Sequence, residues 1–154
     1  MTENTMSNIV LAIIELDTFP KDVAKRAAWI AERYGCDLEL MFSDPTLGVL
    51  RDSYLVSGQA QQIAENIREA QEQILHDLAE GVSASGLTIA TSVTHDRPAA
   101  AAIVARAIEI EPRFVVKGTN YHSPAERATF TYTDWRLIRR LTVPLWLVKP
   151  QELK

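Results

Sequence analysis

The stretch from Asn8 to Glu15 reads NIVLAIIE, an uninterrupted apolar run between two polar ends. Several of its residues are β-branched, and apolar side chains fall on both sides of the extended chain. This pattern is typical of a strand that is buried on both faces, as in the middle of a parallel sheet. The run is far shorter than the roughly 20 residues that span a bilayer. We therefore expect a central strand here.

The residues after this strand carry the signals of a helix. Asp17 or Thr18 is expected to cap it, and Pro20 suits its first turn. Apolar residues then recur at helical spacing up to Tyr34, and Gly35 is a typical stop. The first strand is therefore followed by a helix on one face of the sheet.

The rest of the chain repeats this alternation. Further strands are expected over residues 37–43, 87–94, 114–117 and 143–149. Helices are expected from residue 59 up to the glycines at 81 and 86, over 99–109, and over 133–141 with Thr131 or Thr133 as its cap. A β-α-β-α-β-α-β-α-β order predicts an α/β fold with three layers and a five-stranded parallel sheet. Its ligand site is expected at the carboxyl ends of the strands.

The length of 154 residues fits one domain. We place it at residues 8–150, between a polar tail over 1–7 and a short tail over 151–154. The first seven residues lack the pattern of a signal peptide, so a cytoplasmic protein is expected. The single cysteine, Cys36, excludes an intramolecular disulfide.

The net charge of −4 gives no overall attraction to nucleic acid, and no apolar run is long enough for a membrane span. We therefore expect neither as a partner. The basic segment RLIRR, residues 136–140, is interpreted as the outer side of an amphipathic helix and not as a DNA-binding surface.

Polar residues follow four of the expected strands, and most of them suit turns or caps as well as ligands. Lys117 is the most informative, because a lysine at the end of a buried strand costs free energy unless it reaches water or an anion. We expect it to extend to solvent, or to meet Asp17 or a ligand phosphate. The full set is Asp17 and Thr18, Ser43 and Asp44, His95, Asp96 and Arg97, and Lys117, Gly118, Thr119 and Asn120.

No catalytic or metal-binding pattern occurs. The three histidines, His76, His95 and His122, form no HxxH or HExxH motif, and no GxSxG motif is present. The cysteine is expected far from the carboxyl ends of the strands, which makes it a poor nucleophile candidate. We therefore predict no catalytic residues, no metal and no enzymatic activity.

The order of elements, together with THDRPAAAAIV (residues 94–104) and FTYTDWRLIRRLTVPLWLVK (residues 130–149), resembles the universal stress protein family. The two segments look most like its E-type members, which usually carry two such domains in tandem. The resemblance covers essentially the whole chain and implies the strand order 3-2-1-4-5. The chain holds one such domain, either as a single-domain relative or as half of a longer protein.

Nucleotide-binding members of this family carry a loop of the form G-x2-G-x9-G-[ST]. Its glycines let backbone amides approach phosphate closely. Laid on this chain, the pattern keeps Gly118 but meets Tyr121, Thr131 and Tyr132 at the other three positions. The resemblance thus implies a non-catalytic stress-response protein with a degenerate ATP-binding loop and no cofactor. The alternatives are an ATP- or AMP-binding switch or slow ATPase, and a binder of another anionic or partly apolar ligand.

A modified pocket would draw on main-chain groups at the end of the second strand, on hydroxyls near the last helix and on two cations. The candidate ligand-binding residues are Asp17, Thr18, Met41, Ser43, Lys117, Gly118, Thr119, Asn120, Arg127, Thr131 and Thr133. A third class, a small-molecule enzyme on a related fold, would need a motif such as SGGxDS after the first strand. The segment ELDTFPKD, residues 15–22, has no glycine.

The fifth strand is expected at an edge of the sheet, where unpaired backbone groups favour association with another strand. In the resembled family this strand often pairs with its counterpart. The resemblance therefore implies a homodimer through Val143, Leu145, Trp146 and Leu147, and Pro144 suits an edge strand. The alternative is that a terminal segment of the same chain covers this edge.

Overall fold

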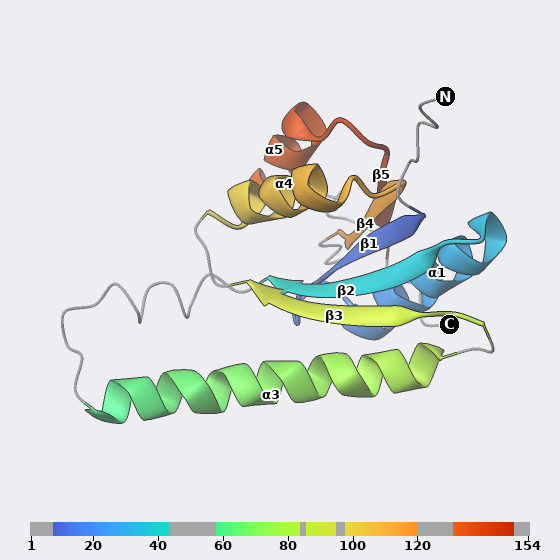
Figure 1. The fold of residues 1–154 in the computed structure, drawn as a ribbon. Helices are drawn as coiled ribbons and strands as arrows, with labels where there is room; N and C mark the ends of the chain where they lie inside the picture. The colour runs from blue at the N-terminus through green and yellow to red at the C-terminus, as the bar shows by residue number, and fades with distance from the viewer. Residues whose placement is uncertain (1–7, 44–57, 84–85, 95–97, 120–130, 150–154) are drawn as a thin grey trace, which may run out of the picture.

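A computed structural model describes residues 8–43, 58–83, 86–94, 98–119 and 131–149. The elements alternate along the chain as predicted (Figure 1). In order they are β1 (Ile9–Ile14), α1 (Pro20–Tyr34), β2 (Asp37–Ser43), α3 (Gly58–Val82), β3 (Ile89–Thr94), α4 (Ala99–Ile110), β4 (Phe114–Gly118), α5 (Tyr132–Arg140) and β5 (Leu145–Val148).

The five strands form one parallel sheet in the order β3-β2-β1-β4-β5, which confirms the predicted architecture. Helices α1 and α3 cover one face, and α4 and α5 cover the other (Figure 1). Strand order reverses between β1 and β4, which are neighbours in the sheet although about a hundred residues separate them in the sequence. The carboxyl ends of these two strands therefore frame the place where open α/β sheets bind ligands.

Strand β1 is buried on both faces, as its sequence predicts. Val10, Ala12 and Ile14 belong to the core that packs against α1 and α3. Leu11 and Ile13 belong to the core beneath α4 and α5. All five side chains are inaccessible to solvent. This strand anchors both layers, so the geometry at its carboxyl end is held firmly.

The start of α1 differs from the prediction. Its N-cap is Phe19, in the left-handed region at φ 56°, and the Phe19 side chain forms no cap hydrogen bond. Instead of capping, the Thr18 hydroxyl donates to the carbonyl of Glu15 at 3.4 Å and tightens the turn after β1. The predicted stop is confirmed: Gly35 adopts φ 65°, and its N–H bonds back to the last helical carbonyls.

Helix α3 runs past Gly81, where a stop was expected, and ends at Val82. Leu75 in its second half is fully buried, whereas Ile63 in its first half is 52% exposed. Figure 1 shows why: the first half of α3 extends past the carboxyl ends of β2 and β3. Within the described part of the chain, no helix is long and apolar enough to cross a membrane.

Candidate functional site

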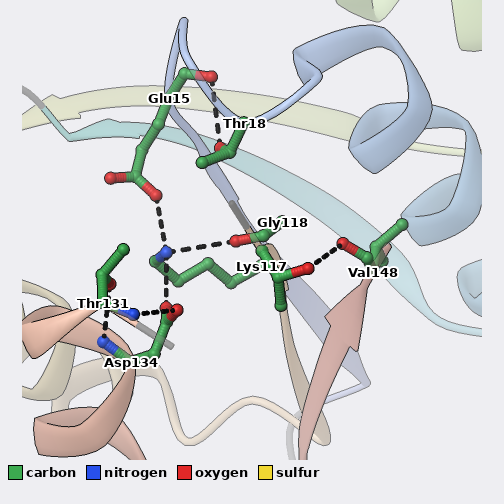
Figure 2. Close-up of polar contacts among 8 residues, drawn as sticks. Glu15, Thr18, Lys117, Gly118, Thr131, Asp134 and Val148 are labelled. Carbon is green, nitrogen blue, oxygen red and sulfur yellow. Dashed lines mark hydrogen bonds and ion pairs between the residues drawn. The ribbon is translucent and has the colours of Figure 1, made fainter. Parts of the chain in front are cut away.

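Three charged side chains meet at the carboxyl ends of β1 and β4, where strand order reverses (Figure 2). Lys117 from β4 lies between Glu15, which directly follows β1, and Asp134 from the first turn of α5. The Nζ atom of Lys117 is 2.8 Å from Oε1 of Glu15 and 2.6 Å from Oδ1 of Asp134. We call these three residues the Lys117 triad.

Lys117 is completely buried, so the expectation that it extends to solvent is wrong. It does not meet Asp17 either, since its carboxylate partners are Glu15 and Asp134. Its ammonium group also donates to the carbonyl of Gly118 at 3.2 Å. The charge of Lys117 is therefore balanced by two ion pairs inside the protein, and one of its N–H donors is used by a backbone carbonyl. Because the side chain of Lys117 has no exposed surface, a phosphate in solvent does not reach it.

Asp134 is equally buried and has a second role at the start of α5. Its carboxylate accepts the backbone N–H of Thr131 at 3.0 Å, and the Thr131 hydroxyl accepts the N–H of Asp134 at 3.1 Å. This reciprocal capping box also places a negative charge at the positive end of the helix. The predicted cap at Thr131 is confirmed, and the protein's own carboxylate occupies the kind of position that binds phosphate in other folds.

The triad carries one cation and two carboxylates in a region with little water. Burial raises the pKa of Glu15, although the attraction of Lys117 opposes this effect. Burial alone would lower the pKa of Lys117, but the two carboxylates outweigh it and hold that pKa above its ordinary value. The raised pKa of Lys117 keeps it charged, whereas burial favours the protonated form of Glu15.

The raised pKa of Glu15 predicts how the stability of the fold depends on pH. Because the pKa of Glu15 lies above 4.5 in the folded chain, the folded state binds a proton there before the unfolded state does. The resulting stabilisation is fully present below pH 4.5 and is lost as the pH rises through the folded pKa. The free energy of unfolding of the wild type, measured relative to Glu15→Gln, should therefore increase as the pH falls from about 8 to about 4.5. Urea titrations of both proteins across this range measure it. A constant difference would contradict the assigned role of Glu15.

The packing around residue 118 requires a glycine there, and the neighbouring sequence does not reveal this requirement. A Cβ atom at this position would lie 2.4 Å from the carbonyl oxygen of Thr18 and 2.9 Å from Cγ2 of Val23. The turn after β1 thus packs directly onto the end of β4. The next residue, Thr119, is fully buried, and its N–H and hydroxyl donate to the carbonyl of Val148 at 2.9 and 3.3 Å. Gly118 and Thr119 thus stabilise the contacts of the end of β4 with the turn after β1 and with β5.

The remaining candidates are dispersed around this cluster. Thr18 is buried against Gly118, whereas Asp17 is exposed. Met41 and Ser43 are buried at the end of β2, and Thr133 is half-buried in α5. Asn120, Tyr121, His122 and Arg127, like the segment His95 to Arg97, lie outside the described residues. No cluster of His, Cys, Asp and Glu suited to a metal occurs in the described ranges.

Sequence reasoning missed Glu15 and Asp134, the two partners of Lys117. The spacing of Thr131 and Asp134 is a capping-box pattern, and it was the one local signal for Asp134. Glu15 had no such signal, because its partners lie about a hundred residues away in the chain.

Comparison with known proteins agrees with the architecture. The sequence pattern of the Universal stress protein family matches residues 6–149. Universal stress protein E of Escherichia coli K12 is 24% identical over 143 residues, which is 92% of this chain and 45% of that relative. The chain thus spans about half the length of the relatives it matches.

Solved structures share the fold at low sequence identity. A universal stress protein from Archaeoglobus fulgidus superposes with a TM-score of 0.64 at 22% identity, covering 93% of this chain and 98% of that one. The structure of that organism's protein in complex with dAMP gives 0.59 at 20% identity, with the same coverage of 93% and 98%. A universal stress protein in complex with cAMP gives 0.58 at 16% identity, covering 94% and 98%. With the matched pattern covering nearly all of its residues, this chain belongs to the universal stress protein family.

Proposed function

We infer that this chain is a non-catalytic universal stress protein that acts by associating with another protein chain and does not bind ATP. One observation carries the proposal: Lys117 is completely buried, and its ammonium group is already ion-paired with Glu15 and Asp134 and bonded to the carbonyl of Gly118. With both carboxylates ionised, the triad has a net negative charge, which opposes a triphosphate at the same place. Tyr121 and Tyr132 stand at sequence positions where the nucleotide loop has a glycine and a serine or threonine.

Calorimetry with ATP and Mg²⁺ tests this proposal. We expect no saturable heat at ligand concentrations up to the millimolar range. The Archaeoglobus fulgidus protein that was solved with dAMP, titrated with dAMP, serves as the positive control for the method. Tight, saturable binding of ATP to this chain would refute the proposal.

A nucleotide-binding switch is the second candidate, because structural neighbours were solved with cAMP and dAMP. It requires nucleotide to bind through backbone groups and not through Lys117. Candidates for such contacts, or for contacts with another small ligand, remain Asp17, Thr18, Ser43 and Thr133. Ultraviolet absorbance of a denatured extract separates the candidates, since a switch purified with its ligand would show nucleotide at 260 nm.

We also propose that the protein dimerises through β5, which lies at the edge of the sheet. The carbonyls of Pro144 and Val148 accept N–H groups from the β4 side. Because backbone polar groups alternate sides along a strand, those of Leu145 and Leu147 face away from β4. They offer a row of donors and acceptors to a second strand.

Leu147→Pro tests this interface with little disturbance of the monomer. Proline removes the outward N–H and is tolerated on an edge strand, so the β4–β5 bonds should survive. We expect light scattering after gel filtration to show a dimer for the wild type and for Leu147→Val, and a monomer for Leu147→Pro. An unchanged dimer in the proline variant would place the interface elsewhere.

A further inference from the structure

An apolar groove of about 310 Å³ lies between the start of α1 and the second half of α3. It is on the opposite side of the sheet from the Lys117 triad, since α1 and α3 share one layer and α5 belongs to the other (Figure 1). Pro20, Ile74, Leu78 and Val82 supply its apolar lining. These side chains are half-buried, so their outer surfaces are open to a bound molecule.

One rim of the groove is positively charged. Lys21 and Lys25 are four residues apart on α1, which places them on the same side of the helix. Both are exposed, and neither forms an ion pair with another residue of the described ranges. The one acidic lining residue, Asp77, already accepts a hydrogen bond from Gln73 at 2.9 Å. The groove thus joins an apolar floor to two exposed ammonium groups that have no ion-pair partner in the described part of the chain.

Gly81 is the second distinctive feature of the groove. It lies inside the last turn of α3, where glycine destabilises a helix relative to alanine. Its φ is not in the left-handed region, and a Cβ atom there would meet nothing within 4 Å. Neither backbone conformation nor close packing therefore requires this glycine. Its effect is to leave open the space that a side chain would fill.

We propose that this groove binds an amphipathic monoanion, a free carboxylate with an unbranched alkyl chain of medium length. The alkyl chain would lie along Ile74, Leu78 and Val82, beside Gly81, and the carboxylate would face Lys21 and Lys25. At roughly the 30 Å³ that a water molecule occupies in the liquid, the volume accommodates about ten non-hydrogen atoms. The carbons of a saturated acid of eight to ten carbons fill this volume when the two carboxylate oxygens lie outside it, at the lysine rim.

Decanoate is the probe, with decanol and decyltrimethylammonium as neutral and cationic analogues of equal chain length. Amide NMR spectra of the full chain are recorded during each titration, below the concentration at which the probe forms micelles. We expect saturable binding of decanoate with shifts confined to α1 and α3, and about tenfold weaker binding of both analogues. Lys21→Gln with Lys25→Gln should weaken decanoate about tenfold and leave decanol unchanged.

Gly81→Leu should weaken decanoate and decanol alike by more than tenfold, because the new side chain occupies the groove. Gly81→Ala, which raises helix propensity and fills less space, shows by its thermal melt that the helix tolerates substitution. Arg68→Gln removes a positive charge elsewhere on α3 and should leave binding unchanged.

Three outcomes would overturn the proposal. They are the absence of saturable decanoate binding, equal affinities for the three probes, and binding that Gly81→Leu does not affect. Binding to anionic vesicles but not to free decanoate would likewise replace the proposed ligand with a membrane surface. None of these outcomes bears on ATP, so this groove and the Lys117 triad are tested independently.

Discussion

Lys117→Met is expected to lower the free energy of unfolding by about 3–5 kcal/mol, the usual cost of removing one partner from a buried ion pair. Methionine keeps most of the side-chain volume, so the loss reports on charge. Glu15 and Asp134 would remain near one another without the cation that lies 2.8 and 2.6 Å from them. Urea denaturation at neutral pH measures the change. The pKa of Lys117 is raised from 10.5, so its charge contributes fully below that pH and the contribution is lost only above it.

Lys149→Met is the matched control, because Lys149 is exposed. Its effect should stay within about 0.5 kcal/mol. Combining Lys117→Met with Glu15→Gln and Asp134→Asn removes all three charges and should recover part of the lost stability. A loss below about 1 kcal/mol in Lys117→Met alone would show that the triad is not buried as described.

Gly118→Ala is expected to cost about 1–3 kcal/mol whether or not any nucleotide is present, as overpacking commonly does. The new Cβ would lie 2.4 Å from the Thr18 carbonyl oxygen, which belongs to the backbone and cannot rotate away. The turn after β1 or the end of β4 must therefore shift. Thermal and urea unfolding of the purified variant measure the loss.

Gly81→Ala provides the control for this substitution. A Cβ atom at residue 81 meets nothing within 4 Å, so this variant should be at least as stable as the wild type. If Gly118→Ala were also as stable as the wild type, Gly118 would not be needed for packing. It also follows that loss of nucleotide in a Gly118→Val variant would not by itself identify a phosphate loop.

The order of the elements and the central strand could be predicted because the signals are local. A continuous apolar run marks β1, and Pro20 and Gly35 bound α1 through their own backbone preferences. The predicted cap of α1, Asp17 or Thr18, was wrong. The turn after β1 packs against Gly118, and no local sequence pattern encodes this contact. Helix α3 runs through Gly81 because one glycine lowers helix propensity without ending a helix that is packed by Leu75.

The site was harder to predict than the fold. The sequence shows that Lys117 needs an anion or water, and this requirement is correct. It does not show which anion, because Glu15 and Asp134 reach Lys117 only once β1, β4 and α5 are assembled. Gly118 likewise looks like the remnant of a phosphate loop in the sequence, whereas its contact with Thr18 gives it a packing role.

Native mass spectrometry of the protein, purified without added nucleotide, tests the central claim most directly. If Glu15 and Asp134 already neutralise the positive charge of Lys117, the protein should appear at the mass of its polypeptide, or of a dimer, with no adenine nucleotide attached. Adding ATP and Mg²⁺ in excess should not produce a stoichiometric complex. A species heavier by one ATP, ADP or AMP per chain, lost on denaturation, would contradict the account.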